Sequence, residues 1–246
     1  MALRVAVAGA LGRMGRLACT TIAAAADLEL VGAIARSNVG HDLAAVLGTT
    51  SPSGAIHADL ASLRASAQPD VLVDFTLFPA SRDLAFAAVE SGIAPVIGVS
   101  GWGDDDLSAL ADRCARSATG AAFIPNFAVG AVLMMRYAAA AARYFPTAEI
   151  IELHHDGKRD KPSGTAKATA ARIARATGRP EVPIHSVRLR GLVAHQAVLF
   201  GGEGEILTLR HDSTSRESFA GGILLAVRRV RGCTGLVIGL DAFLEE

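Results

Sequence analysis

Two hydrophobic patterns alternate along the first half of the chain. Short apolar runs cover residues 4–8, 28–34, 71–75, 95–99 and 121–124, and segments that favour a helix cover 12–26, 81–91 and 104–119. Three aspartates, Asp104 to Asp106, open the last of these helices, where the positive end of the helix dipole favours them. Short strands that alternate with helices are typical of a parallel sheet covered on both faces, so we predict a Rossmann-like, doubly wound α/β domain. Residues 37–67 are less regular and receive no assignment.

The pattern changes after Pro125-Asn126. A long apolar helix is predicted over 129–145, a strand over 148–155 and a second helix over 163–177, and strand-like runs follow at 185–190, 194–200 and 205–211. Consecutive strands without helices between them predict an antiparallel or mixed sheet, and so a smaller α+β domain over 126–215 for substrate binding and oligomerisation. A final helix over 216–231 and a strand over 235–240 are expected to return to the first domain, residues 1–125, which we expect to bind a dinucleotide.

Composition and charge exclude several classes of protein. The 246 residues are enough for two modest domains, and the formal net charge is zero, so we expect neither a nucleic-acid nor an anionic-membrane partner. The chain has no apolar stretch of about 18 residues and no signal-peptide layout, so no membrane span is predicted. Three widely spaced cysteines, Cys19, Cys114 and Cys233, are interpreted as buried small hydrophobes in a reducing compartment. We therefore expect a soluble, cytoplasmic protein.

A glycine-rich turn follows the first predicted strand and precedes the first predicted helix. It reads Gly9-Ala10-Leu11-Gly12-Arg13-Met14-Gly15. Glycines at such a turn let the backbone approach a pyrophosphate closely, and the amides at the start of the helix hold the phosphates. The spacing is GxxGxxG rather than the usual GxGxxG, so the position after a strand carries most of the weight. The alternative is a tight turn in which the glycines serve packing alone.

The end of the second strand bears on the choice of cofactor. An acidic residue there would bind the ribose hydroxyls of NADH, whereas an arginine would pair with the 2′-phosphate of NADPH. This chain has Ala35 followed by Arg36, and Arg13 lies in the glycine turn. We therefore predict that NADPH is preferred, with NADH as a second candidate. The alternative is that Arg36 is only a solvated surface charge, as most single arginines are.

A second segment combines groups that suit proton transfer and anion binding. Two adjacent histidines, His154 and His155, end a predicted strand, and Lys158 follows in a charged loop. Histidine exchanges protons near neutral pH, and lysine serves as a cation or a proton donor. The helix that follows begins at Ser163-Gly164-Thr165, where a serine cap, backbone amides and a hydroxyl suit a carboxylate. Together these groups predict a site for a small dicarboxylate that must be protonated.

Simpler interpretations exist for each part of this segment. The histidine pair is typical of a metal site, but no third ligand lies at a usual spacing, so we expect no metal. The charges from Asp156 to Lys161 could form nothing more than an exposed loop, and the residues from Pro162 to Thr165 an ordinary helix start. Each simple interpretation alone would be preferred. The occurrence of the histidine pair, the lysine, the charged loop and the helix start together in one segment favours a functional site.

The segment resembles the signature of the dihydrodipicolinate reductase family. That signature has a glutamate, two residues later a histidine pair, then a lysine, an aspartate and Pro-Ser-Gly-Thr-Ala, and every position is matched between Glu152 and Ala166. The resemblance extends over most of the chain. It includes the segments Gly9–Gly15, Val73–Thr76, Val96–Gly101, Pro125–Gly130 and Ser213–Arg216, together with Phe219.

The resemblance implies a reaction in the diaminopimelate route of lysine biosynthesis. A hydride from the nicotinamide would reach the cyclic imine derived from 4-hydroxy-tetrahydrodipicolinate, with loss of water, and a proton would reach the neighbouring carbon. By this analogy His154 is a proton donor or acceptor and Lys158 is the proton donor. The residues implied to bind the substrate are His155, Ser163, Gly164, Thr165 and Arg216. Those implied to bind the cofactor, beside the glycine turn and Arg36, are Phe75, Thr76, Gly98, Val99, Ser100, Ile124, Pro125, Asn126 and Phe127. Family members are commonly homotetramers.

Three positions depart from the family pattern. Val99 and Ser100 stand where members often have two threonines, so a contact at Val99 must use the backbone. Ala35 stands where many members have an acidic residue, which argues against strong use of NADH. Lys161 precedes Pro162 where members often have alanine, and we assign no role to its charge.

Two other functions remain open at this stage. The first is another Rossmann reductase of a small carboxylated substrate, such as a homoserine or semialdehyde dehydrogenase. The acylating kind of aldehyde dehydrogenase needs a nucleophilic cysteine, and none of the three cysteines lies in a plausible catalytic loop. The second is a regulatory protein that binds NADP without catalysis. Such a protein would have little reason to keep both His154 and Lys158 beside a complete helix start for anion binding.

Overall fold

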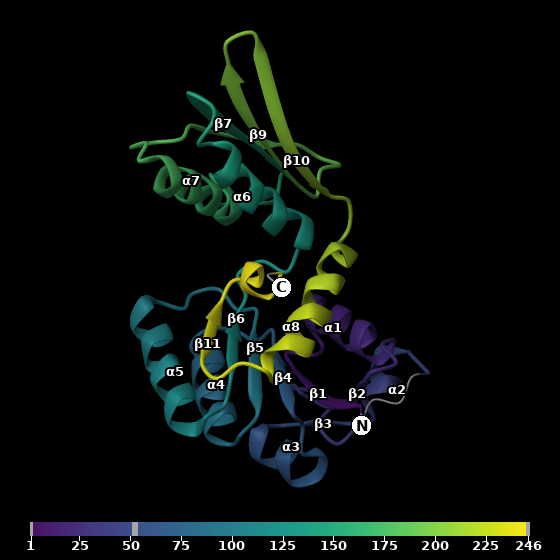
Figure 1. Cartoon of the computed structure of the whole chain (residues 1–246). Coiled ribbons are helices and arrows are strands. Elements are labelled where there is room, and N and C mark those ends of the chain that lie inside the picture. Colours follow the sequence, from purple (N-terminus) through teal and green to yellow (C-terminus); the bar gives the residue numbers. More distant parts are fainter. Residues whose placement is uncertain (1, 51–53, 245–246) are drawn as a thin grey trace. The chain divides into compact units, whose positions relative to one another are not determined.

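The computed structural model describes residues 2–50 and 54–244. The chain divides into two compact units (Figure 1). The first consists of Met1–Phe127 together with Ala220–Glu246, and the second consists of Ala128–Phe219.

The first unit is built on a seven-stranded sheet in which each pair of neighbouring strands runs parallel. The strand order is β11-β6-β5-β4-β1-β2-β3, and it reverses direction between β1 and β4. The predicted Rossmann-like sheet is therefore confirmed, and the last strand, β11, pairs with β6 at one edge of it. The strands are β1 (Leu3–Ala8), β2 (Leu28–Ile34), β3 (Ala55–His57), β4 (Val71–Asp74), β5 (Ala94–Ile97), β6 (Ala121–Phe123) and β11 (Leu236–Ile238).

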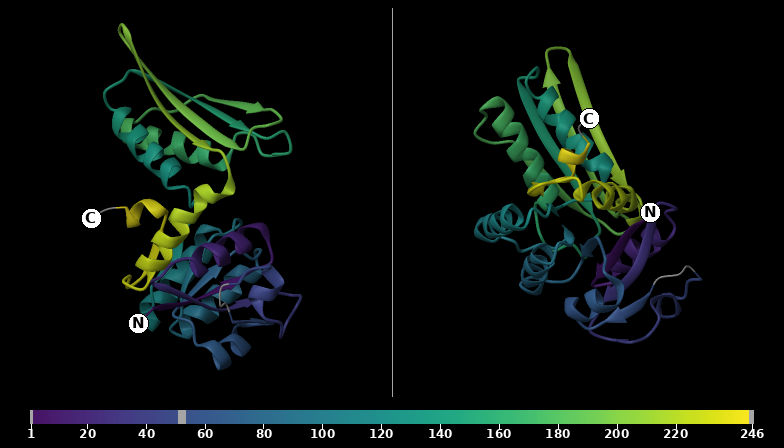
Figure 2. Two further views of the ribbon diagram at one scale, coloured as in Figure 1. Left: turned by 90° about the vertical axis from the view of Figure 1, so that its right-hand side faces the viewer. Right: turned by 60° about the horizontal axis from the view of Figure 1, so that its bottom comes forward.

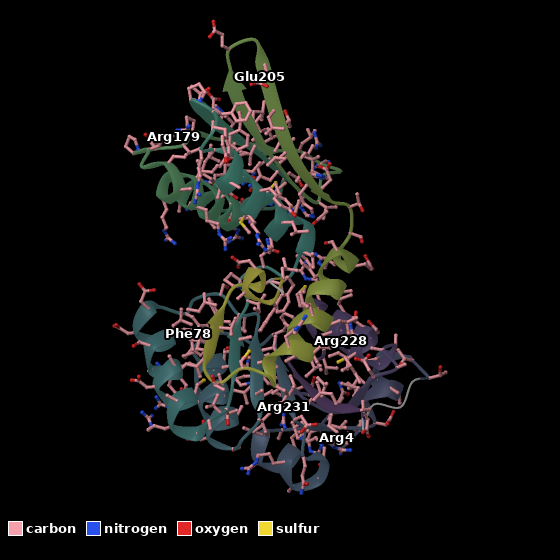
Figure 3. All side chains as sticks on the ribbon, in the orientation of Figure 1. Arg4, Phe78, Arg179, Glu205, Arg228 and Arg231 are labelled. Carbon is pink, nitrogen blue, oxygen red and sulfur yellow. The ribbon has the colours of Figure 1, made fainter. Side chains whose placement is uncertain are left out.

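Helices connect these strands and pack on the sheet. They are α1 (Arg13–Ala23), α2 (Leu43–Leu47), α3 (Leu60–Ala67), α4 (Ala80–Glu90), α5 (Asp104–Ser117), α8 (Ala220–Val230) and the 3₁₀ helix η2 (Leu240–Phe243). Helix α5 begins with the three predicted aspartates. Helices α1 and α8 are neighbours, and Arg228 of α8 donates two hydrogen bonds of 2.8 Å to the carboxylate of Asp27, just beyond α1 (Figure 3).

The segment without a sequence assignment, residues 37–67, contains α2, β3 and α3. Leu60 and Leu63 of α3 pack in one apolar cluster with Val31 of β2 and Leu72 of β4. Short elements explain why the hydrophobic pattern was weak here, since β3 has three residues and α2 has five.

The second unit is a four-stranded mixed sheet with two helices on one face (Figure 2). The strand order is β10-β9-β7-β8, in which β7 and β8 are parallel and the other pairs are antiparallel. The predicted mixed sheet is therefore confirmed. Its elements are α6 (Val129–Ala141), β7 (Thr147–His154), α7 (Gly164–Thr177), β8 (Ile184–Arg188), β9 (Ala194–Gly202), β10 (Glu205–Ser213) and the 3₁₀ helix η1 (Arg216–Phe219).

Three expectations need correction. Helix α6 ends at Ala141 rather than at Phe145, because Phe145 precedes a proline and the Arg179 guanidinium binds the carbonyl oxygens of Ala142 and Phe145 (Figure 3). The final helix covers 216–230 but begins with a 3₁₀ turn. Its first turn is η1, in which the Ser218 hydroxyl hydrogen-bonds to the Ser215 carbonyl oxygen, and α8 follows. Finally, Cys19 and Cys114 are buried as predicted, but Cys233 is partly exposed.

No helix in the described part of the chain is both long enough and apolar enough to cross a membrane.

Candidate active site

The glycine-rich turn is shaped by close backbone packing after β1. Gly9 has a positive φ of 73°, and a Cβ atom there would lie 2.6 Å from the carbonyl oxygen of Phe75. A Cβ atom at Gly15 would lie 2.1 Å from the carbonyl oxygen of Gly9. Neither position accepts another residue without movement of the backbone. Gly12 is the N-cap of α1 and supplies no side-chain cap, so the start of this helix suits the phosphates of a dinucleotide.

The predicted cofactor residues of the first unit lie at one edge of its sheet. They directly follow the carboxyl ends of β1, β2, β4, β5 and β6, which point the same way because the strands are parallel. This edge flanks the reversal of strand order between β1 and β4, where open α/β sheets bind ligands. The side chains of Ala10, Val99, Ile124 and Phe127 are buried, so a ligand at this edge would meet these residues mainly through their backbone.

Two phenyl rings pack together beyond the ends of β4 and β6. The ring centres of Phe75 and Phe127 are 5.4 Å apart in an edge-to-face arrangement. A Cβ atom at Gly98 would lie 2.3 Å from Phe75 Cε1 and 2.7 Å from Phe127 Cε2. The glycine after β5 therefore leaves the space that the two rings occupy.

Asp74 is a buried carboxylate to which the sequence interpretation gave no role. It ends β4 and accepts hydrogen bonds from the Thr76 backbone (2.8 Å), the Thr76 hydroxyl (2.6 Å) and the Ser81 hydroxyl (2.5 Å). Burial raises the pKa of Asp74, although these hydrogen bonds partly oppose the rise. The side chain fixes the loop that carries Phe75 and Thr76. An aspartate followed by a threonine at a strand end was the available signal.

The cations expected near an adenosine phosphate are on the surface. Strand β2 ends at Ile34, Ala35 is half-buried, and Arg36 is exposed, as is Arg13 in the glycine turn. No carboxylate follows the strand before Asp42. This end of β2 therefore offers positive and not negative charge.

The second unit holds the histidine and lysine of the signature segment at the carboxyl end of β7. His154 is the last residue of the strand, and its Nδ1 atom lies 2.5 Å from Oε2 of Glu152. Burial lowers the pKa of His154, with help from the cationic Lys158 and Arg188, and Glu152 opposes the change only in part. The imidazole is therefore neutral at neutral pH. Because the carboxylate can only accept, the ring carries its proton on Nδ1 and leaves Nε2 as a proton acceptor.

Glu152 forms a buried ion pair with Arg188 of β8. Each of its carboxylate oxygens is 2.8 Å from a different terminal nitrogen of the guanidinium, and neither side chain is more than 6% exposed. Burial acts to raise the pKa of Glu152, but hydrogen bonds from Arg188, Ser186 and His154 outweigh it and lower the pKa to about 2. The sequence interpretation missed Arg188, because only strand pairing reveals a contact across 36 residues.

Lys158 lies in the loop after β7 and is partly buried. Its Nζ atom is 2.8 Å from Oδ1 of Asp160, and this cation lowers the pKa of Asp160. The neighbouring histidine of the pair, His155, is exposed. The described residues contain no group of three or more His, Cys, Asp or Glu side chains that could hold a metal ion.

The start of α7 lies beside these groups. Ser163 caps the helix by accepting a hydrogen bond of 3.1 Å from the Ala166 backbone, as predicted, and its own N–H donates to Oε1 of Glu152 at 3.2 Å. Gly164 is exposed, and a Cβ atom added there would meet nothing within 4 Å. The helix start is therefore open to a small anion at Gly164, with Thr165 next to it.

Arg216 belongs to the same end of the second sheet. It begins η1 three residues after β10 ends, and strand pairing aligns Ser213 of β10 with Ala194 of β9 and Ala194 with His154. The side chain of Arg216 is exposed. The structure thus gathers all the predicted substrate residues at one end of the second unit and all the predicted cofactor residues at one edge of the first.

Sequence comparison assigns the chain to a family. Residues 3–127 match the sequence profile of the dihydrodipicolinate reductase N-terminus, and residues 130–244 match that of the C-terminus. The chain belongs to the dihydrodipicolinate reductase family. The predicted family is thereby confirmed. Two curated relatives, both named 4-hydroxy-tetrahydrodipicolinate reductase, come from Moorella thermoacetica (46% identity, 99% of this chain and 98% of the relative) and Geobacillus kaustophilus (43% identity, 100% of both).

Solved structures agree with this assignment. A dipicolinate-bound dihydrodipicolinate reductase from Paenisporosarcina sp. TG-14 is 39% identical and superposes with a TM-score of 0.86, over 98% of this chain and 99% of that one. An amine dehydrogenase from Mycobacterium smegmatis, at 15% identity and a TM-score of 0.69 over 98% of this chain and 96% of that one, shares the fold alone. Membership of the dihydrodipicolinate reductase family therefore rests on sequence and structure together.

Proposed function

We propose that this chain is an NADPH-dependent 4-hydroxy-tetrahydrodipicolinate reductase of the diaminopimelate route to lysine. The observation that carries the proposal is the arrangement at the end of β7. This region brings together neutral His154, hydrogen-bonded to the buried Glu152, the Lys158–Asp160 ion pair and the open start of α7. Relatives at 41–46% identity bear the name of this activity, and the related structure from Paenisporosarcina holds dipicolinate, a planar dicarboxylate.

The substrate-binding role belongs to groups that complement two carboxylates. The backbone amides of Gly164 and Thr165 lie at the positive end of α7, and Arg216 at the same end of the sheet adds a guanidinium. The exposed His155 is a further donor. Ser163 has a smaller share, since it is buried and its hydroxyl oxygen already accepts a hydrogen bond from the Ala166 backbone.

The residues of the chain handle the protons of the reaction. When bound, the nicotinamide cofactor supplies the hydride. The Lys158 ammonium would give a proton to the carbon beside the one that receives the hydride, so that the ring gains one hydride and one proton. Neutral His154 presents Nε2 as a proton acceptor, which suits removal of a ring proton and its transfer to the departing hydroxyl group, which leaves as water.

The dinucleotide is assigned to the first unit. The residues from Gly9 to Met14 would hold the pyrophosphate, because the turn excludes side chains where the phosphates must approach. Arg36, with Arg13, would pair with the 2′-phosphate and so favour NADPH over NADH. The nicotinamide would lie against the segments after β4, β5 and β6, namely Phe75–Thr76, Gly98–Ser100 and Ile124–Phe127.

The assembly and the compartment are part of the same proposal. The second unit has helices on one face of its sheet only, and the opposite face carries apolar side chains such as Ile206, which is 74% exposed. We infer a homotetramer in which this face meets its symmetry mates. The three cysteines are free, which suits the reducing cytoplasm.

The decisive experiment follows the absorbance of the reduced nicotinamide with substrate made in situ from pyruvate and aspartate semialdehyde by the preceding synthase. We expect rapid oxidation of NADPH, slower oxidation of NADH, and a loss of about 100-fold or more in Lys158→Ala, in the range typical for a general acid. The matched control is Lys167→Ala, an exposed lysine on α7. Tight NADPH binding without oxidation by the wild type would instead favour a regulatory protein.

A further inference from the structure

Every hydrogen-bond donor of the Arg188 guanidinium is used. Its two terminal nitrogens bind the two oxygens of Glu152, each at 2.8 Å. The remaining three N–H groups donate to backbone carbonyl oxygens of Asp160 (2.7 Å), Val187 (2.7 Å) and Lys158 (3.3 Å). A guanidinium has five N–H donors in a fixed plane, so this set of five bonds cannot be reproduced by a lysine.

These bonds join the two groups that we assign to proton transfer. The parallel pairing of β7 with β8 places Arg188 opposite His154 and Ser186 opposite Glu152. Through Glu152, the arginine fixes the partner of the imidazole Nδ1. Through the carbonyl oxygens of Lys158 and Asp160, it fixes the backbone of the loop that carries the lysine.

Stability alone does not account for this arrangement. The desolvation of two buried charges offsets much of their attraction, so a buried ion pair is weak evidence for a stabilising role. A rigid, planar group that is bonded to both halves of a site suits orientation, because small displacements of catalytic groups reduce rates strongly.

We propose that Arg188 is a positioning residue of this active site, which orients His154 through Glu152 and holds the Lys158 loop through its carbonyl oxygens. The proposal rests on the proposed function. Arg188 itself need not touch substrate or cofactor.

The charges that face His154 give the proposal a signature beyond activity. They are the carboxylate of Glu152 on its own strand, the ammonium of Lys158 on the loop, and the guanidinium of Arg188 on the neighbouring strand. Loss of the arginine fork leaves Glu152 less neutralised, so the His154 imidazolium becomes more favourable and the pKa of His154 rises. Lysine keeps the positive charge, so a changed titration of His154 in Arg188→Lys reports the lost fork geometry and not a lost charge.

The test compares Arg188→Lys with Arg190→Lys. Arg190 lies two residues farther along, is 93% exposed and pairs with the exposed Asp156, so it is a matched control. We expect Arg188→Lys to keep the wild-type circular dichroism spectrum and NADPH affinity, to lose about 100-fold in kcat, and to show a raised pKa of His154 by ¹⁵N NMR. Millimolar guanidinium should partly restore the activity of Arg188→Ala. Arg190→Lys should change none of these quantities.

Wild-type kcat and an unchanged His154 titration in folded Arg188→Lys would overturn the proposal. If that variant does not fold, Glu152→Gln tests the same contact. Loss of the carboxylate must lower the pKa of His154, and an unchanged pKa would refute the positioning role. The NMR titration needs no substrate. A wild-type protein without reductase activity would therefore refute the proposed function while the test of Arg188 still gives a result.

Discussion

At the scale of single residues, the candidate site separates a neutral base from a cation only a few positions apart. Burial keeps the imidazole of His154 neutral although it contacts the Glu152 carboxylate. Lys158, in contrast, is partly exposed and pairs with Asp160. A neutral imidazole close to an ammonium group suits acid–base catalysis. Two predictions concern individual side chains.

The first prediction concerns the pH dependence of turnover. Since the pKa of His154 lies below its ordinary value of 6.5, the ring stays unprotonated as pH falls through 6.5. The acid limb of kcat/KM should therefore begin below pH 6.5, and the His154→Gln variant, with much lower activity, should lack that limb. Rates measured between pH 5 and 9 with saturating NADPH check this. An acid limb centred above pH 6.5 would contradict it.

The second prediction concerns the choice of cofactor. Replacement of Arg36 by alanine should raise the KM for NADPH by about tenfold to a hundredfold and leave the KM for NADH within about twofold, because only NADPH has the 2′-phosphate. Arg64→Ala, at an exposed arginine of α3, is the control. An equal rise in both KM values would mean that Arg36 contacts a part of the dinucleotide that both cofactors share. No change in either KM would mean that Arg36 does not contact the cofactor.

At the scale of elements, strand β7 ties the site to the stability of the second unit. The pKa of Glu152 is lowered from 4.5 to about 2, so its contribution to stability is present above pH 4.5 and is lost as pH falls from 4.5 toward 2. Down to pH 3 the loss spans about 1.5 pH units at about 1.4 kcal/mol each, or about 2 kcal/mol.

The third prediction follows from this pH window. In the His154→Gln background, where no histidine titrates beside Glu152, the free energy of unfolding should fall by up to about 2 kcal/mol more between pH 6 and pH 3 than in the same background with Glu152→Gln, because the amide does not titrate. Urea unfolding at the two pH values measures both. Taking the difference between the proteins removes the contribution of the other carboxylates. Parallel pH profiles would show that Glu152 is not held ionised by Arg188.

The elements also show how far the sequence could lead. The β1, β2, β4 and β5 strands followed from pattern, since each buries a mostly apolar run, and the long helices followed from their helix-favouring residues. The elements of residues 37–67 did not follow from pattern. Strand β3 has only three residues, too few to show a hydrophobic repeat, and it forms through pairing with β2. Helix ends were also misjudged where backbone partners decide them, as Arg179 does beyond α6.

In the candidate site, the features that depend on neighbouring residues were predicted, and those that depend on distant contacts or burial were not. Local signals revealed the glycine turn, the His154–Lys158 loop and the cap at Ser163, because cause and effect lie within a few residues. Arg188 and Asp74 were missed as participants. The first acts across a strand pair, and the second acts through burial, which single-sequence patterns report poorly.

At the scale of the whole molecule, the second unit leaves one face of its sheet without helices. Strand pairing puts Leu207 of β10 with the buried Phe200, on the face that carries α6 and α7, and puts Ile206 with Gly201 on the opposite face. The hairpin that carries Ile206 turns beside Glu205 (Figure 3). Val187 of β8 is also exposed. A sheet face with exposed branched apolar side chains is typical of a subunit interface.

The fourth prediction is that this face joins the subunits of a homotetramer. Light scattering coupled to gel filtration should give four times 25.3 kDa for the wild type. Ile206→Glu combined with Val187→Glu should give a smaller species, because burial of two unpaired carboxylates in each contact is unfavourable. Ile238→Glu is the matched control, as Ile238 is a 55% exposed isoleucine on β11 of the other unit. A wild-type monomer would refute the tetramer, and a tetramer that survives the double variant would place the interface elsewhere. The active site gives a further readout. His154 ends β7 of the same sheet, so subunits that stabilise the sheet should also protect kcat, and the dissociated but folded variant should have a lower kcat than the wild type.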